Sequence, residues 1–313
     1  DAGNQIEKFG CSLEARYLQI FKGDEIEFPE DGYQGEDIKD LAKEYADLNG
    51  DSLVNVSAEE RKKALVDFAL PKNISKMQAD MEKYKIFYDK WFFESELHKS
   101  GAVKAVVDLL TKKGLTYEKD GAVWYKNKEV LTQKLLKEGK SQKYIDNLEL
   151  KDDVLIRQNG NPTYFTADIA YHKNKFDRGF TTLIDVWGAD HHGHVMRMKG
   201  AMDAIGYDGD KLNVVLMQLV KLVKDGELVK ISKRTGKAIQ LGDLLDEVPV
   251  DSARFLFNTK EANTQMDFDL DLAVSQDNQN PVYYVQYAHA RICSIFKSLA
   301  KEGISPRECT DAE

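Results

Sequence analysis

A short run of basic and hydroxyl-bearing residues is the strongest chemical signal in the sequence. Lys230 and Lys233 lie three positions apart, Ser232 stands between them, and Arg234 follows directly. Ammonium groups in such a loop would neutralise the charge that develops on a leaving pyrophosphate, which stabilises a transition state electrostatically. The run therefore predicts a polyphosphate site, although two lysines at this spacing alone more often belong to a solvated loop.

A second candidate site begins where a buried strand is predicted to end. Gly188 would let a ligand approach the backbone there, and the N-terminus of the next helix favours anionic or hydroxyl-bearing groups. The polar residues that follow this glycine are Asp190, His191, His192 and His194. The aspartate could instead cap the helix. The three histidines could bind zinc, but no cysteine flanks them and neighbouring histidines at a helix start diverge, so we predict no metal site.

A third candidate site lies at the start of another predicted helix. Tyr164 precedes Asp168 by four residues, so both side chains can face one cavity. A carboxylate there suits a cationic ligand, because it can bind a guanidinium group through two parallel hydrogen bonds. The alternative is that Asp168 only interacts favourably with the helix dipole.

The elements that must position these residues alternate between strand and helix. Strands are predicted at 154–157, 183–187 and 212–220, and helices at 166–176 and 190–205. This order is typical of α/β proteins with a parallel sheet, whose ligands bind at the carboxyl ends of the strands.

The rest of the sequence is predicted to be mainly helical. Helices are expected at 6–20, 37–48, 57–70, 71–84 and 281–301. Ser57 and Glu60 have the spacing of a capping box, and a break is expected before Pro71. Residues from about 75 to 150 form a predicted α+β insertion, in which Asp120-Gly121 indicates a β-hairpin.

Composition excludes several classes of protein. The 313 residues include 44 basic and 53 acidic side chains, and the first 60 residues hold 16 of the acids but only 5 of the bases. The net charge of −9 argues against a polybasic nucleic-acid binder, although it averages over this asymmetry. With 31 aromatic residues the chain is not of the disordered class, and no apolar run approaches the roughly 18 residues of a membrane span. Three separated cysteines and no leader indicate a reduced, cytoplasmic protein.

Four short sequence motifs of this chain resemble the motifs of one protein family and occur in the same order. The run K-I-S-K-R at 230–234 is similar to the K-M-S-K-S signature of class I aminoacyl-tRNA synthetases. The other strings are D-A-G-N-Q-I at 1–6, P-T-Y-x-x-x-D-I-A-Y at 162–171 and W-G-A-D-H-H at 187–192. Together they resemble the arginyl-tRNA synthetases.

The resemblance implies a fold and a domain organisation. Residues 1–280 would form a Rossmann-type parallel-sheet catalytic domain, with its N-terminal part missing and the α+β insertion inside it. Residues 281–313 would begin an all-α anticodon-binding domain. The H-x-G-H signature of class I would fall before Asp1, so we expect the 313 residues alone to form negligible adenylate.

The resemblance also implies roles for the candidate residues. Tyr164 and Asp168 would hold the substrate L-arginine, and Asn4 and Gln5 would lie close to the pocket wall. The residues expected at ATP are Gly188, Asp190, His191, His192, Lys230 and Lys233. Ser232 would support the catalytic loop, and Arg234 would assist with phosphate or tRNA.

The implied activity is that of an arginine–tRNA ligase. ATP with Mg²⁺ would activate arginine for transfer to tRNA(Arg) in translation, and we expect a monomer. Three alternatives stay open. They are another adenylating enzyme of the superfamily, which would not need Asp168; a noncatalytic synthetase-like tRNA-binding or regulatory module; and a metal hydrolase that uses His191, His192 and His194.

Overall fold

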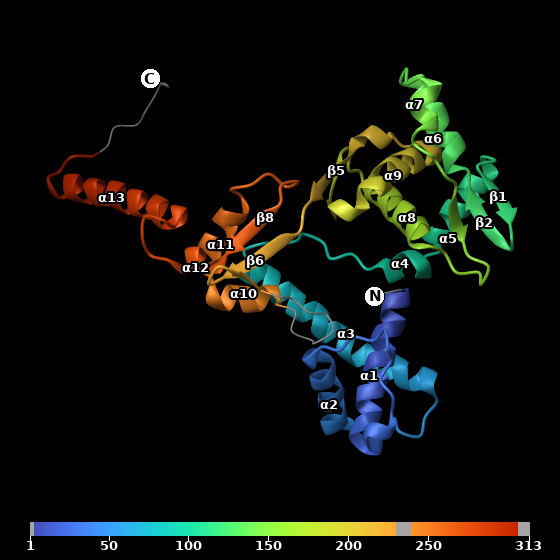
Figure 1. Ribbon diagram of the computed structural model, residues 1–313, viewed down its shortest axis with the longest axis horizontal. Helices are drawn as coiled ribbons and strands as arrows, with labels where there is room; N and C mark the ends of the chain where they lie inside the picture. Colours follow the sequence, from blue (N-terminus) through green and yellow to red (C-terminus); the bar gives the residue numbers. More distant parts are fainter. Residues whose placement is uncertain (1–2, 230–238, 306–313) are drawn as a thin grey trace. The chain divides into compact units, whose positions relative to one another are not determined.

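The computed structural model describes residues 3–229 and 239–305 and divides them into two compact units (Figure 1). Unit 1 comprises residues 3–7, 88–219 and 262–264. Unit 2 comprises residues 8–87, 220–229, 239–261 and 265–305. The run that holds Lys230, Ser232, Lys233 and Arg234 lies outside the described residues.

The helices and strands of unit 1 combine a small antiparallel sheet with a parallel βαβ unit. In order they are α4 (Glu94–Lys99), α5 (Ala102–Lys112), β1 (Thr116–Lys119), β2 (Ala122–Tyr125), α6 (Asn127–Lys137), α7 (Gln142–Asp146), β3 (Asp153–Ile156), α8 (Tyr164–Asp177), β4 (Leu183–Gly188), α9 (His192–Ile205) and β5 (Leu212–Met217). Short 3₁₀ turns, Ala189–His191 and Gly209–Lys211, precede α9 and β5.

The predicted hairpin is confirmed. β1 and β2 pair antiparallel around Asp120 and Gly121, which both have positive φ angles of 52° and 72°. A two-residue turn of this kind matches the twist of the strands, and Asp-Gly suits it because aspartate and glycine tolerate positive φ.

The predicted strand at 154–157 has a different neighbour from the one expected. We expected it to begin the alternating parallel sheet, but β3 pairs antiparallel with β2, with Trp124 opposite Val154 and Tyr125 opposite Asp153. The apolar pattern of the strand specifies which face is buried but not which strand it pairs with. The antiparallel sheet β1-β2-β3 therefore continues beyond residue 150.

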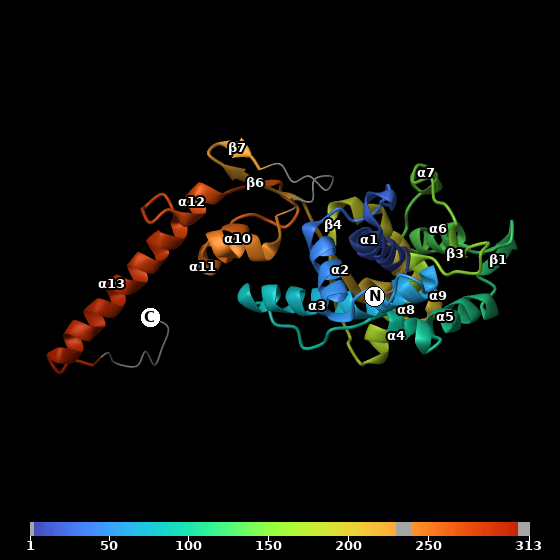
Figure 2. The same ribbon diagram turned by 90° about the horizontal axis from the view of Figure 1, so that it is seen from below.

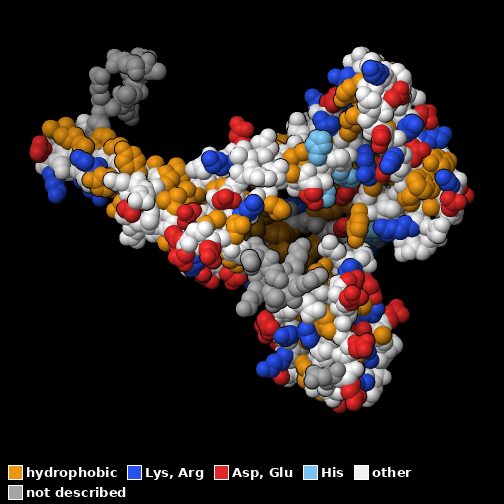
Figure 3. Space-filling model, viewed as in Figure 1, with side chains coloured by type: hydrophobic (Ala, Val, Ile, Leu, Met, Phe, Trp, Pro, Cys, Tyr) orange, Lys and Arg blue, Asp and Glu red, His pale blue; other side chains and the backbone are white. Residues whose placement is uncertain are grey.

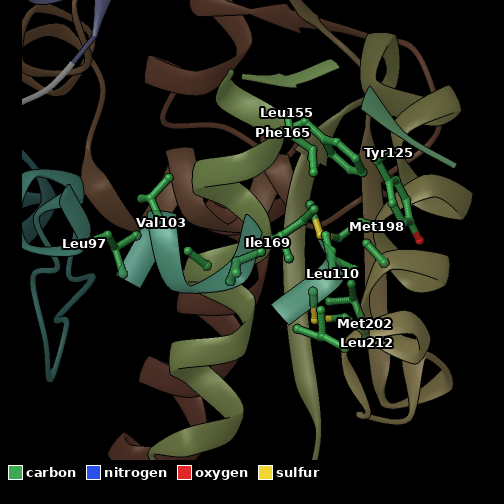
Figure 4. Close-up of a cluster of buried hydrophobic side chains, with 14 of the residues drawn as sticks. Leu97, Val103, Leu110, Tyr125, Leu155, Phe165, Ile169, Met198, Met202 and Leu212 are labelled. Carbon is green, nitrogen blue, oxygen red and sulfur yellow. The ribbon is translucent and has the colours of Figure 1, made fainter. Parts of the chain in front are cut away.

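The parallel βαβ unit is confirmed at β4, α9 and β5. The two strands pair in parallel from Leu183 opposite Leu212 to Gly188 opposite Met217. Side chains alternate across β4, so Leu183 and Asp185 are buried while Ile184 and Val186 are exposed. α5, α8, α9, β2 and β3 supply most of the core on the buried side, including Leu110, Tyr125, Leu155, Ile169 and Met198 (Figure 4).

The predicted strand at 212–220 is in fact two strands. β5 ends at Met217, and β6 (Val220–Lys224) begins after Gln218 and Leu219 and joins a different sheet. The backbone N–H of Gln218 donates to the carbonyl of Ala262, 3.0 Å away, instead of continuing the ladder with β4. A continuous apolar run contains no signal for such a change of partner.

Unit 2 begins with three helices that pack around Leu13, Tyr17, Ile38 and Leu65. These helices are α1 (Asn4–Lys22), whose first four residues belong to unit 1, α2 (Glu36–Asn49) and α3 (Ala58–Lys83). The capping box of α3 is confirmed, since Ser57 accepts from the Glu60 N–H and the Glu60 carboxylate accepts from the Ser57 N–H.

The break expected before Pro71 is wrong, because α3 continues through this residue. Proline removes one backbone hydrogen bond of a helix interior. Packing on both sides compensates for the loss. Leu65 and Ala69 are buried against α1 and α2, and further along α3 Lys83 pairs with Asp246 of α10 (Leu241–Glu247).

The rest of unit 2 is a small mixed sheet with short helices and one long helix. The remaining elements are β6, β7 (Glu227–Leu228), α10, α11 (Val250–Phe257), β8 (Met266–Asp269), α12 (Leu270–Val274) and α13 (Pro281–Lys301). β6 lies between β7 and β8, antiparallel to the first and parallel to the second. Leu244, Val248, Leu256 and Phe268 form the core of this part.

α13 spans the range predicted for it. Asn280 caps it by accepting from the N–H of Val282, 3.1 Å away, and Pro281 occupies its first turn. The helix is unbroken in Figure 2, and apolar side chains gather along it in Figure 3. Within the described residues no helix is long and apolar enough to span a membrane.

Candidate functional site

The first turn of α8, which carries Tyr164, is fixed to β3 by two threonines. The hydroxyl of Thr163 donates to the carbonyl of Val154, and that of Thr166 donates to the carbonyl of Leu155, each over 2.8 Å. Tyr164 itself is 51% exposed. The helix therefore presents the tyrosine at the surface of unit 1 from a rigid base.

Asp168, one turn further along α8, contacts His194 of α9. His194 Nε2 lies 3.2 Å from Asp168 Oδ2, and the Asp168 side chain remains 47% exposed. The histidine ring packs between Phe165 and Trp187, with ring centroids 5.5 Å and 5.2 Å away. Asp168 is thus held from the inner side by a packed imidazole and stays open to a ligand on the outer side.

A buried ionic network lies behind Asp168. His172 Nδ1 is 2.7 Å from the backbone carbonyl of Asp168, and His172 Nε2 contacts the carboxylate of Asp185 on β4. Lys175 Nζ lies 2.6 Å from the other carboxylate oxygen of Asp185. Burial by itself would raise the pKa of Asp185, but the hydrogen bonds and charges of His172 and Lys175 outweigh it and lower that pKa.

A partly buried carboxylate, Asp153 of β3, lies beneath the same helices. Arg197 of α9 pairs with it, its Nη2 atom 2.8 Å from Asp153 Oδ1. Burial nevertheless raises the pKa of Asp153 by more than the charges of Arg197 and His194 lower it. The guanidinium of Arg197 also stacks 4.9 Å from the ring of Phe165. The pair thereby joins β3 to α9 under the start of α8.

A cavity of about 760 Å³ opens beside Tyr164 within unit 1. Asn4, Tyr164 and Arg157 line it, together with Glu94 and His98 of α4. Asn4 and Tyr164 therefore line the same cavity. Gln5 and Asp168 are not part of its wall.

The residues after β4 form a short, exposed turn. Gly188 ends the strand, the 3₁₀ turn Ala189–His191 follows, and α9 starts at His192 rather than at residue 190 as predicted. A Cβ atom on Gly188 would lie 2.5 Å from Asp190 Oδ1, so a larger residue there would displace the Asp190 side chain. Asp190 does not cap α9, since the capping position is His191 and carries no side-chain cap.

The histidines of this turn do not converge. His191 Nε2 lies 3.7 Å from Asp190 Oδ2, whereas His194 turns to Asp168. In the ranges 3–229 and 239–305 no three His, Cys, Asp or Glu side chains gather in a way that could hold a metal ion.

Comparison with known proteins identifies the family. The model for the catalytic domain of class I (R) tRNA synthetases matches residues 31–293. The chain belongs to this family. The arginine–tRNA ligase of Ruminiclostridium cellulolyticum is 56% identical over 97% of this chain and 51% of its own length. The arginine–tRNA ligase of Caldanaerobacter subterraneus is 54% identical over 100% of this chain and 53% of its own length. The chain spans about half the length of the curated relatives it matches.

Solved structures agree with this assignment. A Campylobacter jejuni protein described as an arginyl-tRNA synthetase superposes with a TM-score of 0.79 and 36% identity, over 97% of this chain and 62% of its own. The Thermus thermophilus arginyl-tRNA synthetase, 19% identical, shares the fold with a TM-score of 0.63 over 94% of this chain and 56% of its own. The predicted α/β fold of a class I synthetase catalytic domain is thereby confirmed.

Sequence reasoning missed two residues of this synthetase domain that contact Asp168. His194 was considered only as a zinc ligand, and His172 received no role. The contact of His194 depends on how α8 packs against α9, which no spacing along the chain encodes, whereas the contact of His172 lies within α8. The one available signal was the four-residue spacing of Asp168 and His172, which places them one helical turn apart.

Proposed function

We propose that the intact protein carrying this chain is an arginine–tRNA ligase. It activates L-arginine with ATP to arginyl-adenylate, releases pyrophosphate, and transfers the arginyl group to the terminal ribose of tRNA(Arg). The observation that carries the proposal is the placement of Asp168, a half-exposed carboxylate held by His194, one helical turn from Tyr164.

Arginine recognition rests on Asp168 in this proposal. A guanidinium group donates two parallel hydrogen bonds, and a carboxylate fixed from one side is pre-oriented to accept both. His194 occupies one lone pair of Asp168 Oδ2, and each carboxylate oxygen has a second acceptor position. Tyr164 and Asn4 line the adjacent cavity, and we place the rest of the amino acid there, with Gln5 at its edge.

ATP recognition rests on the turn after β4. Gly188 leaves the backbone open at the carboxyl end of a parallel strand, and the exposed carboxylate of Asp190 can accept hydrogen bonds from ribose hydroxyl groups. His191 and His192 lie at the start of α9, where the helix N-terminus favours negative charge. These residues fit the nucleoside part of ATP.

The phosphates are assigned to the lysine-rich run. Lys230 and Lys233 neutralise charge on the leaving pyrophosphate, Ser232 supports their loop, and Arg234 assists with phosphate or tRNA. Mg²⁺ accompanies the ATP phosphates. Attack of the arginine carboxylate on the α-phosphorus is an in-line displacement that the enzyme accelerates by positioning and electrostatics.

The proposal extends to the organisation of the protein. Residues 1–280 belong to the catalytic domain, with the α+β insertion at about 75–150, and residues 281–313 begin an all-α anticodon-binding domain. The exposed apolar side chains of α13, such as Ile292 and Ile295, suit a helix that packs into such a domain. We further propose a cytoplasmic monomer.

The test is calorimetric titration of the Asp168→Asn variant with arginine and with ATP. We expect at least a tenfold loss of arginine affinity and unchanged ATP affinity. The matched control is Asp177→Asn at the other end of α8, whose carboxylate accepts from Lys173. Unchanged arginine affinity in Asp168→Asn would favour another adenylating enzyme. Arginine binding without charging of tRNA(Arg) by the intact protein would favour a noncatalytic module.

A further inference from the structure

The imidazole of His194, the inner partner of Asp168, is held in place by its neighbours. Its side chain is 17% exposed, and its ring packs between Phe165 and Trp187, with centroids 5.5 Å and 5.2 Å away. Its Nε2 atom lies 3.2 Å from Asp168 Oδ2. Because an ionised carboxylate only accepts hydrogen bonds, a neutral imidazole with its proton on Nε2 can make this contact. The histidine can therefore orient Asp168 without carrying a charge.

A second proton on His194 would change what Asp168 offers to a ligand. Histidine ordinarily changes its charge between about pH 5 and 8. The imidazolium would neutralise the carboxylate from its inner side, while a guanidinium group approaches the same carboxylate from its outer side, where Asp168 is 47% exposed. Two cations would then share one carboxylate. Because like charges a few ångströms apart repel each other, the guanidinium group would bind more weakly.

The other charged groups around His194 come from β3, α9 and β4. Burial raises the pKa of Asp153 on β3, and the charges of Arg197 and His194 lower it, so the carboxylate of Asp153 lies within reach of the charge on the imidazole. Arg197, one turn further along α9, pairs with Asp153 over 2.8 Å, so these two charges offset each other. The ring of Trp187 on β4 also contacts two further imidazoles, each of which is paired with a carboxylate: His172 with Asp185, and His191 with Asp190.

We propose that His194 is a positioning residue that couples arginine binding to its own protonation. The neutral imidazole orients Asp168 for a guanidinium group, and the imidazolium competes with that group for the carboxylate. The proposal rests on the proposed function, since it takes arginine as the ligand of Asp168. Coupling between two binding events is reciprocal, so arginine must release protons from the chain wherever His194 is partly protonated.

The test is calorimetric titration of the 313-residue chain with arginine between pH 5.5 and 7.5. The guanidinium group of the ligand stays charged over this range, so a change in affinity comes from the protein. We expect the arginine Kd to be about tenfold higher at pH 5.5 than at pH 7.5. At pH 6.5, titrations in buffers of different ionisation enthalpy should show that binding releases a fraction of a proton. This second measurement needs no variant.

His194→Gln separates a coupled proton from simple packing. The glutamine amide can still donate to Asp168 but does not titrate, so the arginine Kd should stay within about threefold of the parent at pH 7.5 and should lose most of its dependence on pH. His98→Gln changes a histidine that lines the cavity beside Tyr164, and His289→Gln is the matched control at an exposed position of α13. Both of these variants should keep the pH dependence of the parent.

Three results would overturn the proposal. They are parallel pH profiles of the arginine Kd in the parent and in His194→Gln, loss of the pH dependence in His98→Gln instead, and arginine binding at pH 6.5 without proton release. The same titrations distinguish this failure from that of the proposed function. A chain that binds arginine with a Kd independent of pH refutes the coupling alone. A folded chain that binds no arginine at any pH in the range refutes the proposed function, and the coupling with it.

Discussion

The imidazole of His172 contacts the carboxylate of Asp185 and joins α8 to β4, and the two side chains are only 4% and 7% exposed. The second ring nitrogen of His172 faces the backbone carbonyl of Asp168. This pair therefore fixes the helical turn from which Asp168 projects.

Replacing Asp185 by Asn should destabilise the protein strongly. The change leaves the partly buried Lys175 without its counter-charge and the buried His172 without its carboxylate partner, and breaking a buried ion pair costs about 3–5 kcal/mol. Urea denaturation followed by circular dichroism measures the loss. The control is Asp108→Asn, whose pair with Lys104 is exposed on α5 and should contribute less than about 1 kcal/mol. Equal effects of the two substitutions would contradict the assigned role of Asp185.

The carboxylate of Asp185 should also make the stability of the protein depend on pH under acidic conditions. The pKa of Asp185 is lower in the folded protein than the ordinary value of about 3.9, so the unfolded chain binds the proton more readily. The stabilisation is therefore complete above about pH 4 and is lost as the pH falls through the lowered folded pKa. Urea midpoints measured between pH 2 and 7 should fall more steeply below pH 4 in the parent than in Asp185→Asn. Parallel profiles would refute the prediction.

Replacing Pro71 by Ala should stabilise unit 2. The proline is exposed within the continuous helix α3, and proline in a helix interior is about 3 kcal/mol less favourable than alanine. Part of that gain is offset because proline also restricts the unfolded chain. We expect the free energy of unfolding to rise by about 1–2 kcal/mol, measured by urea denaturation. Lys63→Ala, another exposed position of α3, should change it by less than about 0.5 kcal/mol. A destabilised Pro71→Ala would mean that the proline ring itself makes a needed contact.

Removing the imidazole of His194 should weaken arginine binding. The His194→Ala variant leaves Asp168 without its inner partner, so the carboxylate is no longer oriented. A hydrogen bond to a charged group contributes about 1.5–3 kcal/mol, which corresponds to a tenfold or greater increase of the arginine Kd by calorimetry. ATP affinity should not change, and His289→Ala at an exposed position of α13 serves as a control for a general loss of histidine. Tighter arginine binding in His194→Ala would show that the histidine competes with the ligand.

The sequence predicts well those elements whose signals are local. The hairpin at Asp120-Gly121, the capping box at Ser57 and the helix from Pro281 follow from turn and cap chemistry within a few residues. Leu183 to Gly188 could be assigned to a strand because a glycine and a helix follow an apolar run, but the prediction that it is buried is wrong for one face, where Ile184 and Val186 are exposed. Each of these signals acts within one element.

The features that the sequence did not predict depend on contacts between elements. β3 pairs with β2 of the hairpin, a partner that the strand's own sequence does not specify. The apolar run after Leu212 forms two strands and not one, because the N–H of Gln218 donates to the carbonyl of Ala262. The site shows the same limit. Tyr164 and Asp168 stand one turn apart, but Asp168 does not line the cavity beside Tyr164. His194 reaches Asp168 only through the packing of α8 on α9.

The attachment of α8 to β3 also determines how the chain can be shortened. Thr163 and Thr166 fix the first turn of α8 to β3, and among the strands that the structure describes β2 is the one that pairs with β3. Excising residues 85–150 and closing the gap with a linker would therefore remove the strand that supports the turn carrying Tyr164. A minimal synthetase core trimmed in this way would lose the alignment of its amino-acid pocket, so the segment is a structural support of that pocket and not a detachable addition.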